Sequence, residues 1–390
     1  MIDYNERINR RIRQVKPSGI RKFFDIASEM EDVISLSVGE PDFYTPWHIR
    51  EAGIGSLEKG RTRYSPNRGF AELRREISRF IRRKYQVDYH PEKELIVTVG
   101  GSEAIDLCLR TLINPGDEVL IPQPSFVCYE PLTLMAGGTP VIIETKVENR
   151  FRLTPEALEA AITPKTKLLI LPYPNNPTGA VMRRKDLERI AQVVSKHDLL
   201  VLSDEIYSEL TYGEEAHTAF SALPGMKERC VLVNGFSKSH SMTGWRLGYA
   251  AGPKAVIDVM TKLHQFAIMS APTTAQYAAI EALKNGDEDI KEMRQQYDMR
   301  RRLMVDSLNK MGLSCFEPQG AFYVFPSVQG TGLTSAAFSE RLIYAKRVAV
   351  VPGDAFGACG EGYLRISYSY SVKHITQALE RIRRFLEEIL

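Results

Sequence analysis

The sequence of 390 residues lacks any uninterrupted apolar run close to the ~20 residues that a membrane-spanning helix needs. It also lacks an excess of charge of one sign, because 51 basic and 48 acidic side chains leave a formal net charge of only +3. Such a balance does not point to nucleic acid or an anionic membrane as the main partner. The first residues carry acids and do not show the charged-then-apolar order of a secretory signal. We therefore expect a protein with no membrane segment and no export signal.

Cysteine is scarce as well, and the five that occur are odd in number and share no spacing typical of metal sites. Three of them stand in apolar runs, which predicts buried free thiols and a reducing, cytoplasmic location. The histidines also lack metal-ligand spacing, so we predict no metal site. No Gly-x-Gly-x-x-Gly follows a predicted strand, which disfavours a nicotinamide dehydrogenase, and no period of 20–50 residues repeats.

Short apolar runs dominate the middle of the chain, and helical patterns separate most of them. Near-continuous runs are typical of strands covered on both faces, and alternation with helices is typical of a parallel sheet. We predict an α/β fold in which a large domain, residues 46–280, holds a mostly parallel seven-stranded sheet. The predicted strands are 95–99, 118–121, 140–144, 168–171, 199–203, 231–234 and 247–251.

The pattern changes after a charged helical stretch at 287–311. Strands are predicted at 321–325, 348–351 and 363–369, followed by a final amphipathic helix. With the N-terminal segment they predict a smaller α+β domain made of residues 1–45 and 281–390. Residues 7–16 form a basic arm with Ile8 and Ile12 at helical spacing. Such an arm could bind a membrane surface, but packing on a dimer partner is favoured.

Polar groups follow several of the predicted strands, and ligands of open parallel sheets bind at the carboxyl ends of strands. Gly101 and Ser102 begin a helix, where free backbone N–H groups can bind a phosphate and Ser102 would be the cap. Glu103 must then point away from any bound dianion. A Gly-Ser helix start is also common without a ligand, so this signal alone is weak.

Three further groups follow the later strands. Asn176 stands in a proline-rich loop, Asp204 ends a buried run where an unpaired carboxylate would be expensive, and Lys238 follows Asn234-Gly235 with Arg246 eight positions later. Taken singly they could be a turn, a helix cap and surface charges. Lysine condenses with aldehydes, and arginine is the better bidentate partner of phosphate. Pyridoxal 5'-phosphate (PLP), a phosphorylated nitrogen heterocycle with an aldehyde, would use all of these groups.

From Ile34 to Arg365 the chain resembles the class I/II aminotransferases of fold type I, in their prokaryotic branch. The most specific motifs are Asn176-Pro177-Thr178-Gly179, Ser203-Asp204-Glu205-Ile206-Tyr207, Ser237-Lys238 with Thr243-Gly244-Trp245-Arg246, Val351-Pro352-Gly353 with Phe356-Gly357, and Arg365-Ile366-Ser367.

This resemblance implies that Lys238 bonds covalently to the PLP aldehyde and later moves the substrate's Cα proton. It implies that Asp204 pairs with the pyridinium nitrogen, and that Tyr207 and Asn176 hydrogen-bond the ring hydroxylate. Phe126 falls where the family stacks an aromatic side chain on the ring.

The phosphate would be held by Gly101, Ser102 and Arg246. Tyr64 matches a tyrosine that reaches the phosphate from the neighbouring subunit, which implies a homodimer with shared sites. Gly235 replaces a serine found in many relatives, so that phosphate contact is in doubt.

An arginine within an apolar strand needs an anion, and Arg365 is such a residue. The resemblance supplies the substrate's α-carboxylate, with Gly39 and Asn176 beside it. The alternative is a salt bridge inside the small domain. Segment 18–26 is expected, from the same resemblance, to close over the substrate.

The resemblance therefore implies an aminotransferase that moves the amino group of an L-amino acid to an oxo acid such as 2-oxoglutarate in a ping-pong cycle. Its amino acid could be aromatic or broadly chosen, or an acetylated diaminopimelate. A PLP-dependent C–S β-lyase of the same fold stays open as an alternative, as does a PLP-binding regulatory module, although no DNA-binding domain is evident.

Overall fold

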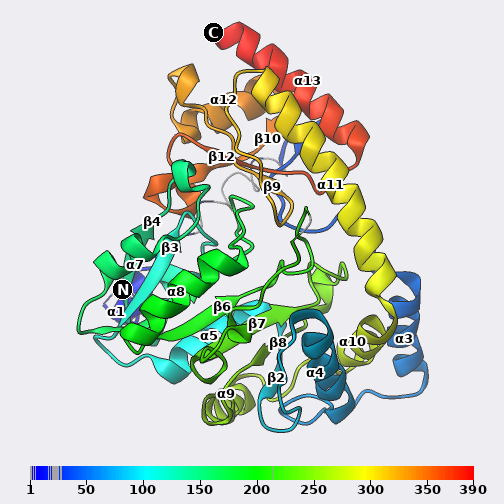
Figure 1. Ribbon diagram of the computed structural model, residues 1–390. Helices are drawn as coiled ribbons and strands as arrows, with labels where there is room; N and C mark the ends of the chain where they lie inside the picture. The colour runs from blue at the N-terminus through cyan, green and yellow to red at the C-terminus, as the bar shows by residue number, and fades with distance from the viewer. Residues whose placement is uncertain are drawn as a thin grey trace.

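The computed structural model describes residues 2, 4, 6–15, 17, 19, 26, 29–213 and 215–390. Its centre is a seven-stranded sheet with the strand order β2-β8-β7-β6-β5-β3-β4 (Figure 1). In this sheet β8 runs antiparallel to both of its neighbours and the other pairs are parallel. The prediction of a mostly parallel seven-stranded sheet is confirmed. The strands are β2 (Leu95–Thr98), β3 (Glu118–Gln123), β4 (Thr139–Glu144), β5 (Thr166–Leu171), β6 (Leu200–Asp204), β7 (Cys230–Gly235) and β8 (Gly248–Ala251).

Helices cover both faces of this sheet, which explains why its strands are apolar throughout rather than alternating. Leu168 and Ile170 of β5 pack with α5 and α9, whereas Leu169 and Leu171 face the opposite side, where α7 and α8 lie. Toward β2, that opposite side is covered by α4 and α10. The helices are α3 (Trp47–Glu58), α4 (Ala71–Tyr85), α5 (Gly100–Leu112), α6 (Tyr129–Ala136), α7 (Pro155–Ala161), α8 (Arg184–Lys196), α9 (Lys254–Ala267) and α10 (Thr273–Asn285).

In α8, Leu187, Ile190, Ala191 and Val194 are all buried. Their spacing of three and four residues places them on one side of the helix. The buried free thiols expected from the sequence are Cys108, Cys230 and Cys315.

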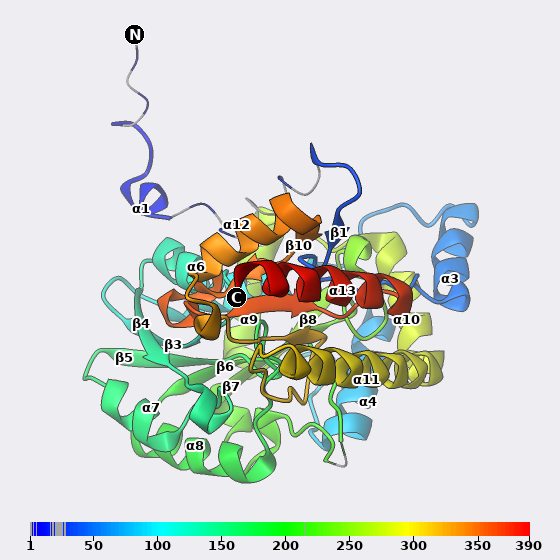
Figure 2. The same ribbon diagram turned by 90° about the horizontal axis from the view of Figure 1, so that it is seen from above.

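A second group of elements lies over one end of the sheet (Figures 1 and 2). It comprises the long helix α11 (Asp287–Lys310), α12 (Ser335–Lys346), α13 (Val372–Ile389) and the short strands β1 (Ile34–Ser35), β9 (Tyr323–Val324), β10 (Val348–Ala349), β11 (Val351–Pro352) and β12 (Leu364–Ser367). Their buried side chains form one apolar cluster that also contains Tyr207 and Leu210. The domain limits given above stay a prediction.

The predicted strand at 348–351 is divided in two. β10 pairs in parallel with β1, whereas β11 pairs antiparallel with β12, so the chain changes partners at Val350. The predicted strand at 321–325 is shorter than expected, since only Tyr323 and Val324 pair with β12.

The N-terminal arm contains the short helix α1 (Arg10–Arg13), which lies against α6 at the edge of the molecule (Figure 2). Ile8 and Ile12 are each 45% exposed, so the described chain does not cover the apolar side of the arm. Most of the predicted lid, segment 18–26, lies outside the described residues. Among the described helices, none combines the length and apolar character needed to cross a bilayer.

Candidate active site

A cavity of about 630 Å³ opens where β5, β6 and β7 end, facing the second group of elements. The sequence predicted that strand ends would meet here, and the cavity brings together side chains from segments nearly 330 positions apart. Ten of the eleven predicted site residues line it: Gly39, Gly101, Ser102, Phe126, Asn176, Asp204, Tyr207, Lys238, Arg246 and Arg365.

Asp204 is the last residue of β6 and is only 6% exposed. The Tyr129 hydroxyl donates to Asp204 Oδ2 at 2.7 Å, and the backbone N–H of Ile206 donates to Oδ1 at 3.2 Å. Burial raises the pKa of Asp204 because it disfavours the charged form, although these two hydrogen bonds oppose the shift. The structure thus holds a carboxylate in the cavity without a cationic hydrogen-bond partner.

Lys238 follows β7, and its Nζ donates to the backbone oxygen of Gly39 at 2.6 Å. The ammonium also lies 5.8 Å from the ring centroids of Tyr207 and Phe322. Burial lowers the pKa of Lys238 to about 8, and the charges of Arg365 and Arg246 act in the same direction. A sizeable fraction of this amine is therefore neutral, and hence nucleophilic, near neutral pH.

Arg246 lies close to the beginning of α5, and this close approach requires a glycine at position 100. A Cβ on Gly100 would lie 2.7 Å from Arg246 Nη2, and Gly100 has a φ of +77°, which glycine adopts at no steric cost. Arg246 Nη1 donates to the Thr243 backbone oxygen at 2.9 Å. No carboxylate of the described residues forms an ion pair with Arg246, so its guanidinium can receive an anion next to the helix start.

The prediction that Ser102 caps α5 is wrong. The helix begins at Gly100 with Val99 at the N-cap, so Ser102 already lies in the first turn. The Glu103 carboxylate accepts the Val99 N–H instead. Its other oxygen contacts His264 Nδ1 at 2.6 Å, and Glu103 does not line the cavity. Glu103 therefore points away from the phosphate position, as the sequence required.

Arg365, on β12, is buried between aromatic rings. Its guanidinium carbon lies 4.7 Å from the Tyr323 ring centroid and 4.8 Å from that of Phe356. Nη1 donates to Asn176 Oδ1 at 3.1 Å, Nη2 donates to the Ser37 backbone oxygen, and Nε has no partner. No described carboxylate forms an ion pair with it, so the alternative of a salt bridge within the small domain finds no support among the described residues. A buried guanidinium without an anion favours a site for a carboxylate.

The cavity therefore combines two guanidinium groups, neither of them in an ion pair within the described chain, with one buried carboxylate and a partly neutral amine. Such a set can bind two anions and form a covalent bond to an aldehyde. This chemistry agrees with the family comparison, in which the model described as aminotransferase class I and II matches residues 31–382.

The chain is a class I and II aminotransferase. It is 53% identical to a protein named putative aminotransferase YugH of Bacillus subtilis, with 97% of each chain covered. An aspartate aminotransferase of Pyrococcus abyssi is 46% identical, over 97% of this chain and 98% of the relative. A probable N-acetyl-LL-diaminopimelate aminotransferase of Bacillus subtilis is 42% identical, over 97% and 95%.

Solved structures agree with this family assignment. The crystal structure of an aromatic aminotransferase from Pyrococcus horikoshii superposes with a TM-score of 0.90 at 46% identity, covering 94% of this aminotransferase and 99% of that chain. The predicted fold, that of fold type I transferases, is thus confirmed.

The eleventh predicted residue, Tyr64, does not line the cavity of its own chain and is 83% exposed. Its predicted reach into a neighbouring subunit stays a prediction. Gly235 has a steric reason to be glycine, because a Cβ there would lie 3.0 Å from both Gly248 Cα and the Leu247 backbone oxygen.

Sequence reasoning missed two tyrosines of this aminotransferase. Tyr129 binds Asp204, and its only sequence signal is that it stands three residues after Phe126, one helical turn away. Tyr323 hydrogen-bonds Tyr207, with 2.8 Å between the hydroxyl oxygens. A Cβ on Gly39 would lie 2.5 Å from the Tyr323 hydroxyl, which explains the glycine that the sequence singled out.

Proposed function

We propose that this aminotransferase uses PLP and moves the amino group of an L-amino acid to a 2-oxo acid such as 2-oxoglutarate in a ping-pong cycle. Enzymes with this chemistry keep the cofactor on a lysine, with an aspartate partner for the pyridinium nitrogen. The observation that carries the proposal is the juxtaposition of Asp204, buried and without a cation bonded to it, with the amine of Lys238 in one cavity.

The residues of the cavity fit the parts of PLP. Gly100 leaves the space next to Arg246 that a Cβ would fill, which supports a phosphate position at the start of α5, with Gly101 and Ser102 in its first turn. Asp204 offers a carboxylate to the ring nitrogen, and Phe126 offers an aromatic face. Tyr207 and Asn176 supply a hydroxyl and an amide for the ring hydroxylate.

When bound, the cofactor supplies an aldehyde and a protonated pyridine ring that withdraws electrons from the substrate's Cα. Lys238 is the nucleophile that holds the aldehyde, and its lowered pKa of about 8 lets the same amine accept and return the Cα proton near neutral pH. Asp204 holds the proton on the ring nitrogen by charge pairing. Tyr323 orients Tyr207 through their shared hydrogen bond.

Arg365 and Asn176 are proposed to bind the substrate's α-carboxylate. The guanidinium is fixed by Asn176 Oδ1, the Ser37 carbonyl and two rings, so it is held in place before the substrate arrives. Arg365 and Gly39 both line the cavity, and a Cβ on Gly39 would lie 3.7 Å from Arg365 Nη1. Fixed orientation of this kind lowers the entropy that binding must overcome.

For the substrate side chain we propose an aromatic or broad preference, with an acetylated diaminopimelate as the second candidate. The cations that line the cavity in the described part of the chain are Lys238, Arg246 and Arg365, and each already has a proposed partner. None of these is left for a second carboxylate, which supports an uncharged side chain over the side chains of aspartate and of the acetylated diaminopimelate, each of which carries one. The relatives named for aspartate, aromatic and diaminopimelate substrates define the panel to test.

A homodimer with shared sites is also proposed. Large apolar side chains are exposed along α3, at Tyr64, in the last turn of α9 and just after it; they are Trp47, Ile54, Leu57, Tyr64, Phe266, Ile268 and Met269. Hydrogen bonds from Asn67 to Met269 and from Thr273 to Arg63 hold these segments together. An exposed apolar surface of this kind is typical of a protein interface. Five free cysteines suit the cytoplasmic location expected from the sequence.

A spectrophotometric half-reaction tests the function. Purified protein with PLP is mixed with phenylalanine, aspartate or N-acetyl-LL-diaminopimelate, and the loss of cofactor absorbance is followed without an oxo acid. Conversion by phenylalanine supports the aromatic preference, whereas conversion by aspartate alone contradicts it. Pyruvate released from a sulfur amino acid under these conditions would favour the C–S lyase. Borohydride reduction and peptide mapping should label Lys238, and an unlabelled Lys238 would refute the assignment.

A further inference from the structure

A second buried carboxylate, Glu205, directly follows Asp204 but does not line the active-site cavity. Its side chain is 1% exposed. Oε1 accepts hydrogen bonds from Ser203 Oγ at 2.8 Å and from the Phe220 N–H at 3.0 Å, and the Glu205 N–H donates to the Val233 oxygen at 2.9 Å. These contacts fix the carboxylate, and its charge is among the causes of the raised pKa of Asp204.

His217 contacts the other carboxylate oxygen of Glu205. Its Nε2 lies 2.7 Å from Glu205 Oε2, and its ring packs edge-on against Tyr85 with 5.6 Å between ring centroids. An imidazole that donates N–H to a carboxylate reduces the field of that carboxylate, and a protonated imidazole balances its charge.

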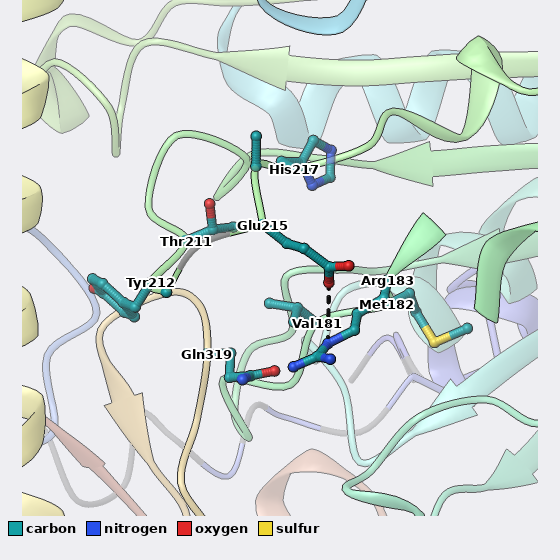
Figure 3. A pocket seen from close by; sticks show the side chains of 10 residues that line it. Val181, Met182, Arg183, Thr211, Tyr212, Glu215, His217 and Gln319 are labelled. Carbon is teal, nitrogen blue, oxygen red and sulfur yellow. Dashed lines mark ion pairs between the residues drawn. The ribbon is translucent and has the colours of Figure 1, made fainter. Parts of the chain in front are cut away.

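On its other side, His217 borders a small pocket of about 360 Å³ (Figure 3). The charged pair in this pocket is Arg183 and Glu215, whose Nε and Oε2 atoms are 3.2 Å apart and joined by the dashed line in Figure 3. The Glu215 carboxylate is thus paired with Arg183. The carboxylate within hydrogen-bond distance of His217 is that of Glu205. The pocket also leaves room for a different side chain at position 217.

We propose that His217 is a positioning residue for catalysis: bonded to Glu205, it balances this buried carboxylate so that Asp204 can stay ionised opposite the ring nitrogen of the cofactor. The inference rests on the proposed function, since it needs a ligand with a protonated ring nitrogen. Two adjacent buried carboxylates oppose each other's ionisation. The charge of Glu205 must therefore be compensated if Asp204 is to stay ionised. His217 touches neither the cavity nor the substrate and acts only through Glu205.

The test compares two cofactors. Apoprotein is titrated with PLP and with the analogue in which a C–H group replaces the ring nitrogen, because only PLP offers a proton to Asp204. For His217→Gln we expect PLP to bind about tenfold more weakly, the equivalent of one pKa unit on Asp204, with little change for the analogue. The glutamine can still donate a hydrogen bond to Glu205, so a loss would show that the imidazole contributes more than this one hydrogen bond.

Two variants and one control sharpen the result. Glu205→Gln removes the charge that needs balancing, so it should keep the wild-type preference for PLP over the analogue, and it should restore that preference in the double variant with His217→Gln. His197→Gln is the matched control, since His197 pairs with Glu159 at 2.8 Å and precedes the start of β6, whereas Asp204 ends that strand. It should change neither affinity.

Equal losses for both cofactors in His217→Gln, or no loss at all, would overturn the inference. So would a loss of the PLP preference in Glu205→Gln. If the wild-type protein binds PLP no better than the analogue, the proposed partnership of Asp204 with the ring nitrogen fails, which is a different result from a failure confined to His217.

Discussion

Removing the charge of Asp204 should stabilise the cofactor-free protein and destabilise the PLP-bound protein. The pKa of Asp204 is raised, so the folded protein holds this proton more tightly than the unfolded chain does. The contribution of this carboxyl group to folding stability is then greatest below the ordinary aspartate pKa of about 3.9. This contribution is lost as the pH rises through the higher pKa of the folded state. Asp204→Asn, which can still accept from Tyr129, avoids this loss.

The size of this stability difference follows from the burial of Asp204. Incompletely compensated burial of a polar group costs about 1–3 kcal/mol in proteins. Unfolding entropy of ~2.1 cal/mol/K per residue over 390 residues gives ~0.8 kcal/mol/K, so the apoprotein variant should melt about 1–4 °C above wild type at pH 8. This difference should vanish below about pH 4, where the wild-type carboxyl group is protonated in both states.

At saturating PLP, Asp204→Asn should melt below the wild-type protein. If Asp204→Asn binds the cofactor ~1,000-fold more weakly, it loses about 4.1 kcal/mol of ligand-derived stability, which exceeds the gain of about 1–3 kcal/mol in the apoprotein. Scanning calorimetry of apoprotein and PLP-loaded protein at two pH values measures all four differences, with Asp306→Asn, an exposed aspartate paired with Lys310, as control. An apoprotein variant no more stable than wild type at pH 8, or equally stabilised at pH 3.5, would refute the argument.

Three further outcomes are expected. Lys238→Ala should retain PLP without a covalent bond and lose turnover, and full turnover in this variant would contradict the assignment. Arg365→Ala should raise KM for every amino acid by about 30-fold or more, the effect of removing one partner of a buried charge pair; an unchanged KM would return this arginine to a structural role. Covalent attachment of PLP to apoprotein should speed up as the pH rises through about 8, where Lys238 becomes neutral, and stopped-flow absorbance showing a midpoint near 10.5 would contradict the lowered pKa.

The sheet could be predicted from the sequence because burial on both faces leaves a local signature. The runs 168–171 and 231–233 are apolar at every position, and the structure places alternate residues in different clusters. The strands of the smaller part were less predictable. Residues 348–351 change partners at Val350, and only tertiary pairing determines such a switch.

Residues at the active site were predictable where a strand end or a motif placed them, as for Asp204, Asn176 and Lys238. Tyr129 and Tyr323 were not, because each acts through a hydroxyl whose partner is 75 and 116 positions away in the chain. A tyrosine in an apolar segment is compatible with many roles. Its hydrogen-bond partner becomes known only when helix α6 and strand β9 are placed against β6 and the loop that follows it.

The two pKa shifts of the site have one cause and opposite signs. Burial raises the pKa of Asp204 and lowers that of Lys238, so it pushes both groups toward their neutral forms. In the same cavity Arg365 and Arg246 lack a carboxylate partner within the described chain. Each of these groups would gain a partner from a ligand that carries a phosphate, a ring N–H and an aldehyde, together with a substrate carboxylate. Binding of this ligand would then add to the free energy of unfolding. We therefore expect PLP to stabilise the apoprotein more than inorganic phosphate does, because phosphate can contact only Arg246 and the start of α5.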